Sequence, residues 1–203
     1  MRKSSLCILI LLAIIHTTIF AAVHTTSLGG FYSFGYINQN SETYSGTAVG
    51  LNLRTTSFFK SLEKFGIRYD LRAAKSLKLK ENNNSASGIK GFDLDLGVAL
   101  AYQQRLTYLS FVEAGLGIQA IGTTKQYTTS EDQRVNQHLL LGVGAFLDYH
   151  YALKNKFALN IGANAKMPLI GFARYGAKND PKTGRVTAKG LEISPHVGVT
   201  FIF

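Results

Sequence analysis

The sequence has one cysteine, three prolines and no tryptophan. The cysteine, Cys7, lies in an apolar N-terminal segment that we expect to be removed, so the mature chain has no disulfide or thiol chemistry. Beyond that segment, no apolar stretch approaches the roughly 20 residues that a helix needs to cross a bilayer. These absences exclude a disulfide scaffold and a helical membrane protein.

The N-terminus has the order of a secretory signal peptide. Arg2 and Lys3 precede an apolar run, Leu6–Ile15, and the small residues Ala21 and Ala22 follow. The run is too short for the rival interpretation, a transmembrane helix. We therefore predict that residues 1–22 are a signal peptide and that residues 23–203 form the mature domain.

In the mature domain, apolar and polar residues alternate in eight segments. In the clearest case, Phe65, Ile67 and Tyr69 take one face, while Gly66, Arg68 and Asp70 take the other. A period of two is typical of a strand with two different surroundings. The predicted strands are Leu28–Ile37, Gly46–Arg54, Phe65–Ala74, Phe92–Gln103, Tyr108–Ala120, Leu139–Tyr151, Phe157–Met167 and Leu191–Phe203.

The last strand ends on a terminal aromatic, with Val199, Phe201 and Phe203 on one face. This ending resembles the signal by which the outer-membrane assembly machinery of Gram-negative bacteria recognises β-barrels. From about Leu28 to Phe203 the chain resembles the small eight-stranded outer-membrane barrels, which include the OmpA transmembrane domain, OmpX and the opacity-type surface proteins. The resemblance implies an all-β, antiparallel, up-and-down transmembrane barrel located in the outer membrane.

The polar faces carry charges of both signs, which we expect to point into the lumen. A Lys or Arg on the lipid face costs about 2–4 kcal/mol near the midplane. Because Arg68 and Arg72 lie on the strand before Asp93 and Asp95, cross-strand ion pairs are expected. Such a lumen is a plug, although a gated ion path is the alternative. The predicted lumen network is Arg54, Arg68, Asp70, Arg72, Asp93, Asp95, Glu113, Asp148, Lys166 and Glu192.

The connections are expected to alternate in length. Ser76–Gly88, Gly122–Asn136 and Arg174–Ala188 are predicted to be long extracellular loops, as is usual in this class. Thr55–Lys64 is too long for a tight turn, and we favour a longer second strand there.

Removal of Arg2 and Lys3 lowers the formal charge from +10 by two, to +8. For an exported barrel we assign this excess to anionic lipopolysaccharide rather than to nucleic acid. A basic patch in the last loop would bind lipopolysaccharide phosphates or acidic host polymers, or would simply be solvated. Its residues are Arg174, Lys178, Lys182, Arg185 and Lys189.

A catalytic set is not evident. Glu192, Ser194 and His196 alternate on one strand, but same-face neighbours lie about 6.6–6.8 Å apart, too far for a Ser–His hydrogen bond. We expect a polar interior row, no metal and no cofactor. The predicted function is a structural or surface-interaction role without catalysis. The alternatives are a small ion channel and, further behind, a lipid-A-modifying enzyme.

Overall fold

The computed structural model describes residues 21–39, 42–129, 132–154 and 156–203. The predicted signal peptide, residues 1–22, falls almost wholly outside them and stays a prediction. Among the described residues, no helix is both long and apolar enough to span a membrane.

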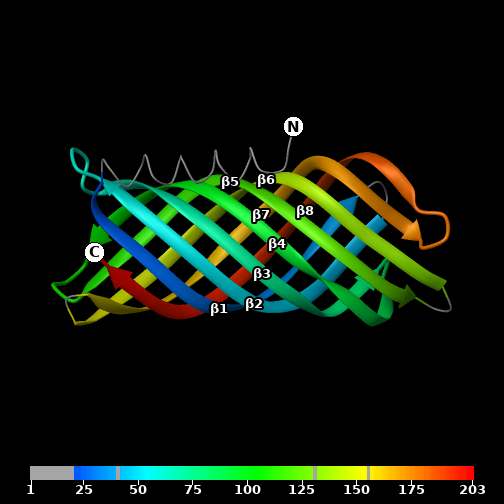
Figure 1. Cartoon of the computed structure of the whole chain (residues 1–203), viewed down its shortest axis with the longest axis horizontal. Coiled ribbons are helices and arrows are strands. Elements are labelled where there is room, and N and C mark those ends of the chain that lie inside the picture. Colours follow the sequence, from blue (N-terminus) through cyan, green and yellow to red (C-terminus); the bar gives the residue numbers. More distant parts are fainter. Residues whose placement is uncertain (1–20, 40–41, 130–131, 155) are drawn as a thin grey trace.

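Eight antiparallel strands pair in sequence order, and β1 pairs with β8 to close a barrel (Figure 1). The all-β, up-and-down prediction is confirmed. Closure satisfies the backbone hydrogen bonds of every strand, which is what a spanning sheet in hydrocarbon requires. The strands are β1 (Ala21–Gln39), β2 (Glu42–Phe59), β3 (Phe65–Glu81), β4 (Asn84–Arg105), β5 (Ser110–Thr129), β6 (Asp132–Lys154), β7 (Phe157–Ala177) and β8 (Lys182–Ile202).

The two ends of the barrel differ. We call the end that carries Phe203 and the turn between β2 and β3 the terminal end; it lies at the left of Figure 1. Here the Phe203 N–H donates to the His24 carbonyl at 2.9 Å, which ties the C-terminus to β1. The opposite end, which carries the turn between β7 and β8, is the distal end.

Exposed apolar side chains form a belt around the outside of the barrel along most of its length. Tyr32, Phe34 and Tyr36 face outward, with 44–47% of their surface exposed. Aromatic pairs lie near the terminal end, where the ring centroids of Phe65 and Tyr102 are 5.2 Å apart. Exposed side chains of this size and number are typical of a surface that meets lipid rather than water.

The prediction of long loops at the distal end is wrong. Residues 76–81 belong to β3 and residues 84–88 to β4, so only Asn82 and Asn83 connect them. Both asparagines have positive φ, 48° and 69°, as a tight hairpin turn requires. The segments 122–136 and 174–188 are likewise mostly strand. The prediction that the second strand is longer is confirmed, since β2 reaches Phe59.

The alternation reverses its polarity toward the distal end, which explains the error. There many inward side chains are apolar and most outward ones are polar. Two buried clusters fill the interior: Ile121, Leu140, Ala173, Tyr175, Val186 and Ala188 with Ile37 against them, and Tyr44, Leu79 and Tyr127 with Ala86 and Ile89 against them. The outward residues in this part meet water, so the pattern no longer resembles a lipid-facing strand.

We predict that Leu140→Ala lowers the free energy of unfolding by about 2–5 kcal/mol, because Leu140 is fully buried in this apolar layer. The matched control is Leu141→Ala, since Leu141 is 59% exposed on the belt. There lipid or detergent refills the space, and the change should be about 0.5 kcal/mol or less. Urea titration followed by circular dichroism measures both; equal losses would contradict the assignment of faces.

Candidate functional site

The structure places all ten residues of the predicted lumen network inside the barrel. They come from seven strands, β2 to β8. Seven are buried, while Asp70, Asp93 and Glu192 are half-buried. Ion pairs divide nine of them into two groups, and Asp93 pairs separately with Lys125. We call the two groups the Asp148 cluster and the Lys166 cluster.

The Asp148 cluster is centred on one carboxylate that serves two guanidinium groups. Asp148 accepts hydrogen bonds from Arg54 at 2.9 Å and from Arg68 at 2.6 Å. His196 Nε2 lies 2.6 Å from the other carboxylate oxygen. Asp70 adds a second carboxylate, 3.2 Å from Arg68. Charges this deeply buried are tolerated only when they are paired and hydrogen-bonded, as they are here.

Neutral and aromatic groups complete this cluster. Arg54 donates to Asn160 at 2.7 Å, and Glu113 accepts from Thr56 at 2.6 Å while lying 3.7 Å from Arg68. The Arg68 guanidinium also stacks on a ring, 3.7 Å above the centroid of Phe146.

A glycine makes room for that ring. A Cβ atom at Gly115 would lie 2.6 Å from Phe146 Cε1, so a larger residue there would displace the ring.

The Lys166 cluster is built around an ammonium group. Lys166 donates to Asp95 and forms an ion pair with Glu192, with its Nζ 3.1 Å from the Glu192 carboxylate. Arg72 lies 3.9 Å from Asp95 and 3.8 Å from Glu192, and its guanidinium is 4.2 Å above the Phe31 ring. These five residues come from five different strands, so they tie the barrel wall together across its interior.

Asp93 stands beside this cluster. Its carboxylate pairs with Lys125 at 2.9 Å and accepts a hydrogen bond from Thr123.

The pairing differs in part from the prediction. Arg72 does face Asp95 on the adjacent strand, but Arg68 pairs across the lumen with Asp148 instead of with Asp93 or Asp95. An eight-stranded barrel is only wide enough for side chains to fill, so opposite walls are within reach of a long arginine. No pattern in the sequence indicated the partners Lys125, Asn160, Phe31 or Phe146.

The row Glu192, Ser194 and His196 does not form a triad. Ser194 donates to Glu192 at 3.2 Å, whereas His196 is held by Asp148 and Arg54. No hydrogen bond joins Ser194 to His196 in the described residues. In the same part of the chain, no group of three or more acidic, His or Cys side chains has the arrangement of a metal site.

A cap closes the distal end over the apolar layer. Arg134 donates to Glu81 at 2.7 Å and lies 3.5 Å from Glu42, and Tyr44 donates to both carboxylates. This group was not predicted from the sequence, because its residues were expected in loops or beside them.

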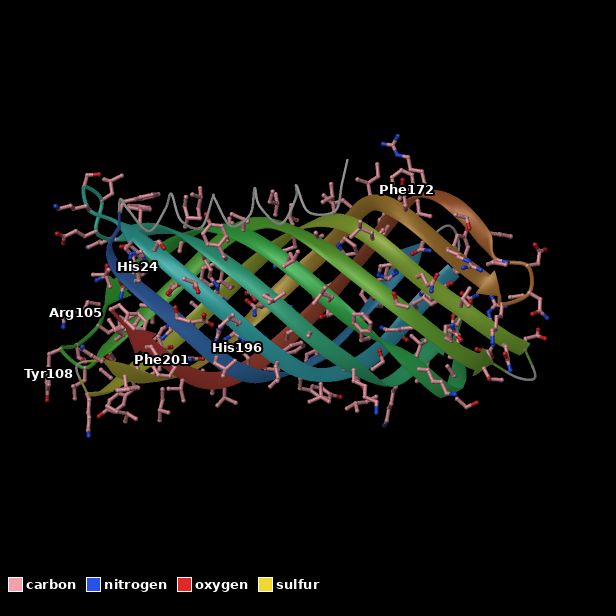
Figure 2. All side chains as sticks on the ribbon, in the orientation of Figure 1. His24, Arg105, Tyr108, Phe172, His196 and Phe201 are labelled. Atoms are coloured by element: carbon pink, nitrogen blue, oxygen red, sulfur yellow. The ribbon has the colours of Figure 1, made fainter. Side chains whose placement is uncertain are left out.

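The predicted basic patch is not a loop. Arg174 lies on β7, while Lys182, Arg185 and Lys189 lie on β8, and only Lys178 occupies the turn between them. At the terminal end of β8, the predicted insertion residues Val199, Phe201 and Phe203 are all exposed on the outer surface, and Figure 2 shows Phe201 at this end.

Open space in the lumen is discontinuous. A cavity of about 990 Å³ opens at the terminal end, where Phe58, Phe111, Lys64 and Arg105 line it. Arg105 and Tyr108 mark this end in Figure 2. Two cavities of only about 10 Å³ each lie among the charged clusters. A cavity of about 70 Å³ lies between the Lys166 cluster and the apolar layer. A further space of about 190 Å³ lies at the distal end, beside Glu81 and Arg134.

Solved structures with this arrangement are membrane barrels. OprG, an outer membrane protein from Pseudomonas aeruginosa, superposes with a TM-score of 0.58 at 14% identity, over 91% of this chain and 97% of that one. A major outer membrane protein from Thermus thermophilus gives 0.58 at 14% identity, over 90% and 100%. The chain has the fold of the outer-membrane β-barrels. No family model and no curated protein matches the sequence.

One similar structure is an enzyme. The outer membrane protease OmpT from Escherichia coli gives a TM-score of 0.54 at 4% identity, over 90% of this chain and 97% of that one. At such identities the likeness concerns the fold alone, because unrelated functions share this architecture. The question of activity therefore depends on the residues of this chain.

We predict that Asp148→Asn lowers the free energy of unfolding by about 3–5 kcal/mol. The substitution keeps the volume but leaves the buried guanidinium groups of Arg54 and Arg68 short of negative charge. Asp180→Asn in the exposed turn between β7 and β8 is the control and should change stability by about 0.5 kcal/mol or less. Urea unfolding in lipid vesicles measures both variants, and a near-neutral Asp148→Asn would contradict a structural role for the cluster.

Proposed function

We propose that this protein is an integral outer-membrane barrel with a structural or surface-interaction role and no catalytic activity. The observation that carries the proposal is an apolar exterior belt around an interior closed by buried ion pairs. The terminal end faces the periplasm, and the distal hairpins project from the cell. Val199, Phe201 and Phe203 serve recognition by the barrel-assembly machinery.

The distal hairpins supply the interaction surface in place of the long loops that the sequence predicted. Their paired strands present outward polar side chains in fixed positions, and the cap of Arg134, Glu42 and Glu81 secures the strands from within. A preorganised surface loses little conformational entropy on binding. The partners in this proposal are outer-membrane lipids and lipopolysaccharide, with acidic host polymers as a further class.

A small ion channel is the first alternative. It would require the Asp148 and Lys166 clusters to exchange partners and the apolar layer above them to take up water. Two closures of different chemistry, ionic and apolar, stand in series along the lumen, which favours a sealed barrel.

A lipid-A-modifying enzyme or a protease is the second alternative. Catalysis needs a nucleophile and base that substrate can reach. Ser194, His196 and Asp148 are at most 3% exposed, and two arginines surround the His–Asp pair. This burial favours a structural role for the row. Mass spectrometry of lipid A from cells with and without the gene should show identical acylation, and a changed pattern would favour the enzyme.

The proposal predicts heat-modifiable migration and an electrically silent barrel. After refolding into detergent, the unboiled protein should migrate differently from its boiled form, because a closed barrel resists unfolding by dodecyl sulfate. In planar bilayers it should give no stable openings. A monomer freely soluble without amphiphile would overturn the membrane assignment, and stable openings that disappear in Arg68→Met would favour the channel.

A further inference from the structure

Seven outward cations gather in two groups at the distal limit of the apolar belt. All seven side chains are exposed, and none forms an ion pair with a residue that the structure describes. We call the groups the β3–β4 arc and the β7–β8 arc. The β3–β4 arc consists of Lys75, Lys78, Lys80 and Lys90, and the β7–β8 arc consists of Arg174, Arg185 and Lys189.

Each arc adjoins apolar side chains that face the same way. Arg174 lies two residues beyond Phe172, which is 68% exposed and points away from the barrel in Figure 2. Lys189 likewise precedes the outward Leu191, and Lys90 precedes Phe92. Because alternate residues of a strand share a face, these three cations each lie directly beyond the last outward apolar residue of their strand. Arg185 lies opposite Phe172 on β7, and Lys75 and Lys78 flank the outward Leu77 on β3, so the arcs lie at the edge of the apolar belt. That is the depth of lipid headgroups.

The other four strands carry neutral residues at the corresponding positions. They are the cross-strand partners of arc cations: Asn38 on β1 opposite Lys189, Thr47 on β2 opposite Lys78, Gln126 on β5 opposite Lys90, and Gln137 on β6 opposite Arg174. In a closed barrel of eight strands paired in sequence order, β7 lies four strands from β3 in either direction. The two arcs therefore occupy opposite sides of the barrel, with neutral surface between them.

Among the residues that the structure describes, no carboxylate pairs with a cation of either arc. Glu42 and Glu81 turn inward and bind Arg134, and Asp93 pairs with Lys125 in the lumen. The exposed Asp180 lies in the turn beyond the β7–β8 arc. The arcs thus keep their positive charge where the belt ends, and such a charge attracts anionic headgroups.

We propose that the two arcs bind the phosphate groups of lipopolysaccharide, with one lipid on each side of the barrel. The inference rests on the outer-membrane location proposed above. A lipid satisfies both halves of each site, because its acyl chains contact Phe172, Leu191 or Phe92 while its phosphates meet the cations. A soluble acidic polymer would engage the cations alone and would gain nothing from the apolar residues beside them.

The test uses the refolded full-length barrel in neutral detergent with purified lipopolysaccharide. One variant removes three charges from the β3–β4 arc (K75Q, K78Q, K90Q), and another removes three from the β7–β8 arc (R174Q, R185Q, K189Q). The matched control removes three exposed lysines at the terminal end (K64Q, K154Q, K156Q). Native mass spectrometry gives the number of bound lipids, and titration with fluorescent lipopolysaccharide gives the affinity.

We expect two lipids on the wild-type barrel and on the control, and one on each arc variant. Affinity at the altered arc should fall at least about tenfold, since three charges are lost at a surface where each contributes. Lipopolysaccharide stripped of its phosphates should bind both arcs of the wild-type barrel as weakly as the intact lipid binds the altered arc of a variant.

Unchanged stoichiometry and affinity in both arc variants would overturn the inference. Heparin is titrated in parallel as a soluble acidic polymer. If the arc substitutions weaken heparin binding and leave lipopolysaccharide binding unchanged, the inference is overturned and the partner is such a polymer. Heat-modifiable migration of every variant verifies folding and keeps the two proposals separate. If the wild-type barrel itself lacks it, the outer-membrane assignment fails; if all variants fold and bind lipid alike, only the arcs lose their role.

Discussion

A backbone surrounded by hydrocarbon has no water to satisfy its amide and carbonyl groups, so each must pair with a neighbouring strand. In this protein the pairing of β1 with β8 completes that requirement and leaves no open edge. Closure then gives each belt residue one of two surroundings, lipid outside or a crowded interior. The outward rows of Leu, Val, Ile and aromatic residues, and the inward charges, follow from this single constraint.

The interior obeys a second constraint, which is its width. A barrel of eight strands leaves little more than the space that side chains occupy, so buried charges must find partners among themselves. Asp148 pairs with both Arg54 and Arg68, and Lys166 pairs with both Asp95 and Glu192. These contacts join strands distant in sequence. They stabilise one arrangement of the wall and also close the lumen, so that structural integrity and impermeability have the same origin.

Toward the distal end the outer solvent changes from hydrocarbon to headgroups and water, and the side chains change with it. Many inward positions become apolar, as at Leu140 and Val186, and pack into a buried cluster. Outward positions become polar or cationic. The two basic arcs stand where these regimes meet, which makes the boundary of the belt the most informative surface of the molecule for binding.

The sequence by itself determined the number of strands, their faces within the belt and the inward position of all ten network residues, since a lipid solvent imposes a local rule with a period of two. It did not determine how far the strands extend, because the reversed pattern at Leu79, Tyr127 and Val186 looks like a polar loop when it is read with lipid outside. Nor could it assign the partner of Arg68. Only the tertiary structure decided that, because closing the barrel brings β3 and β6 within one side chain's length across the lumen, a proximity that sequence separation does not encode.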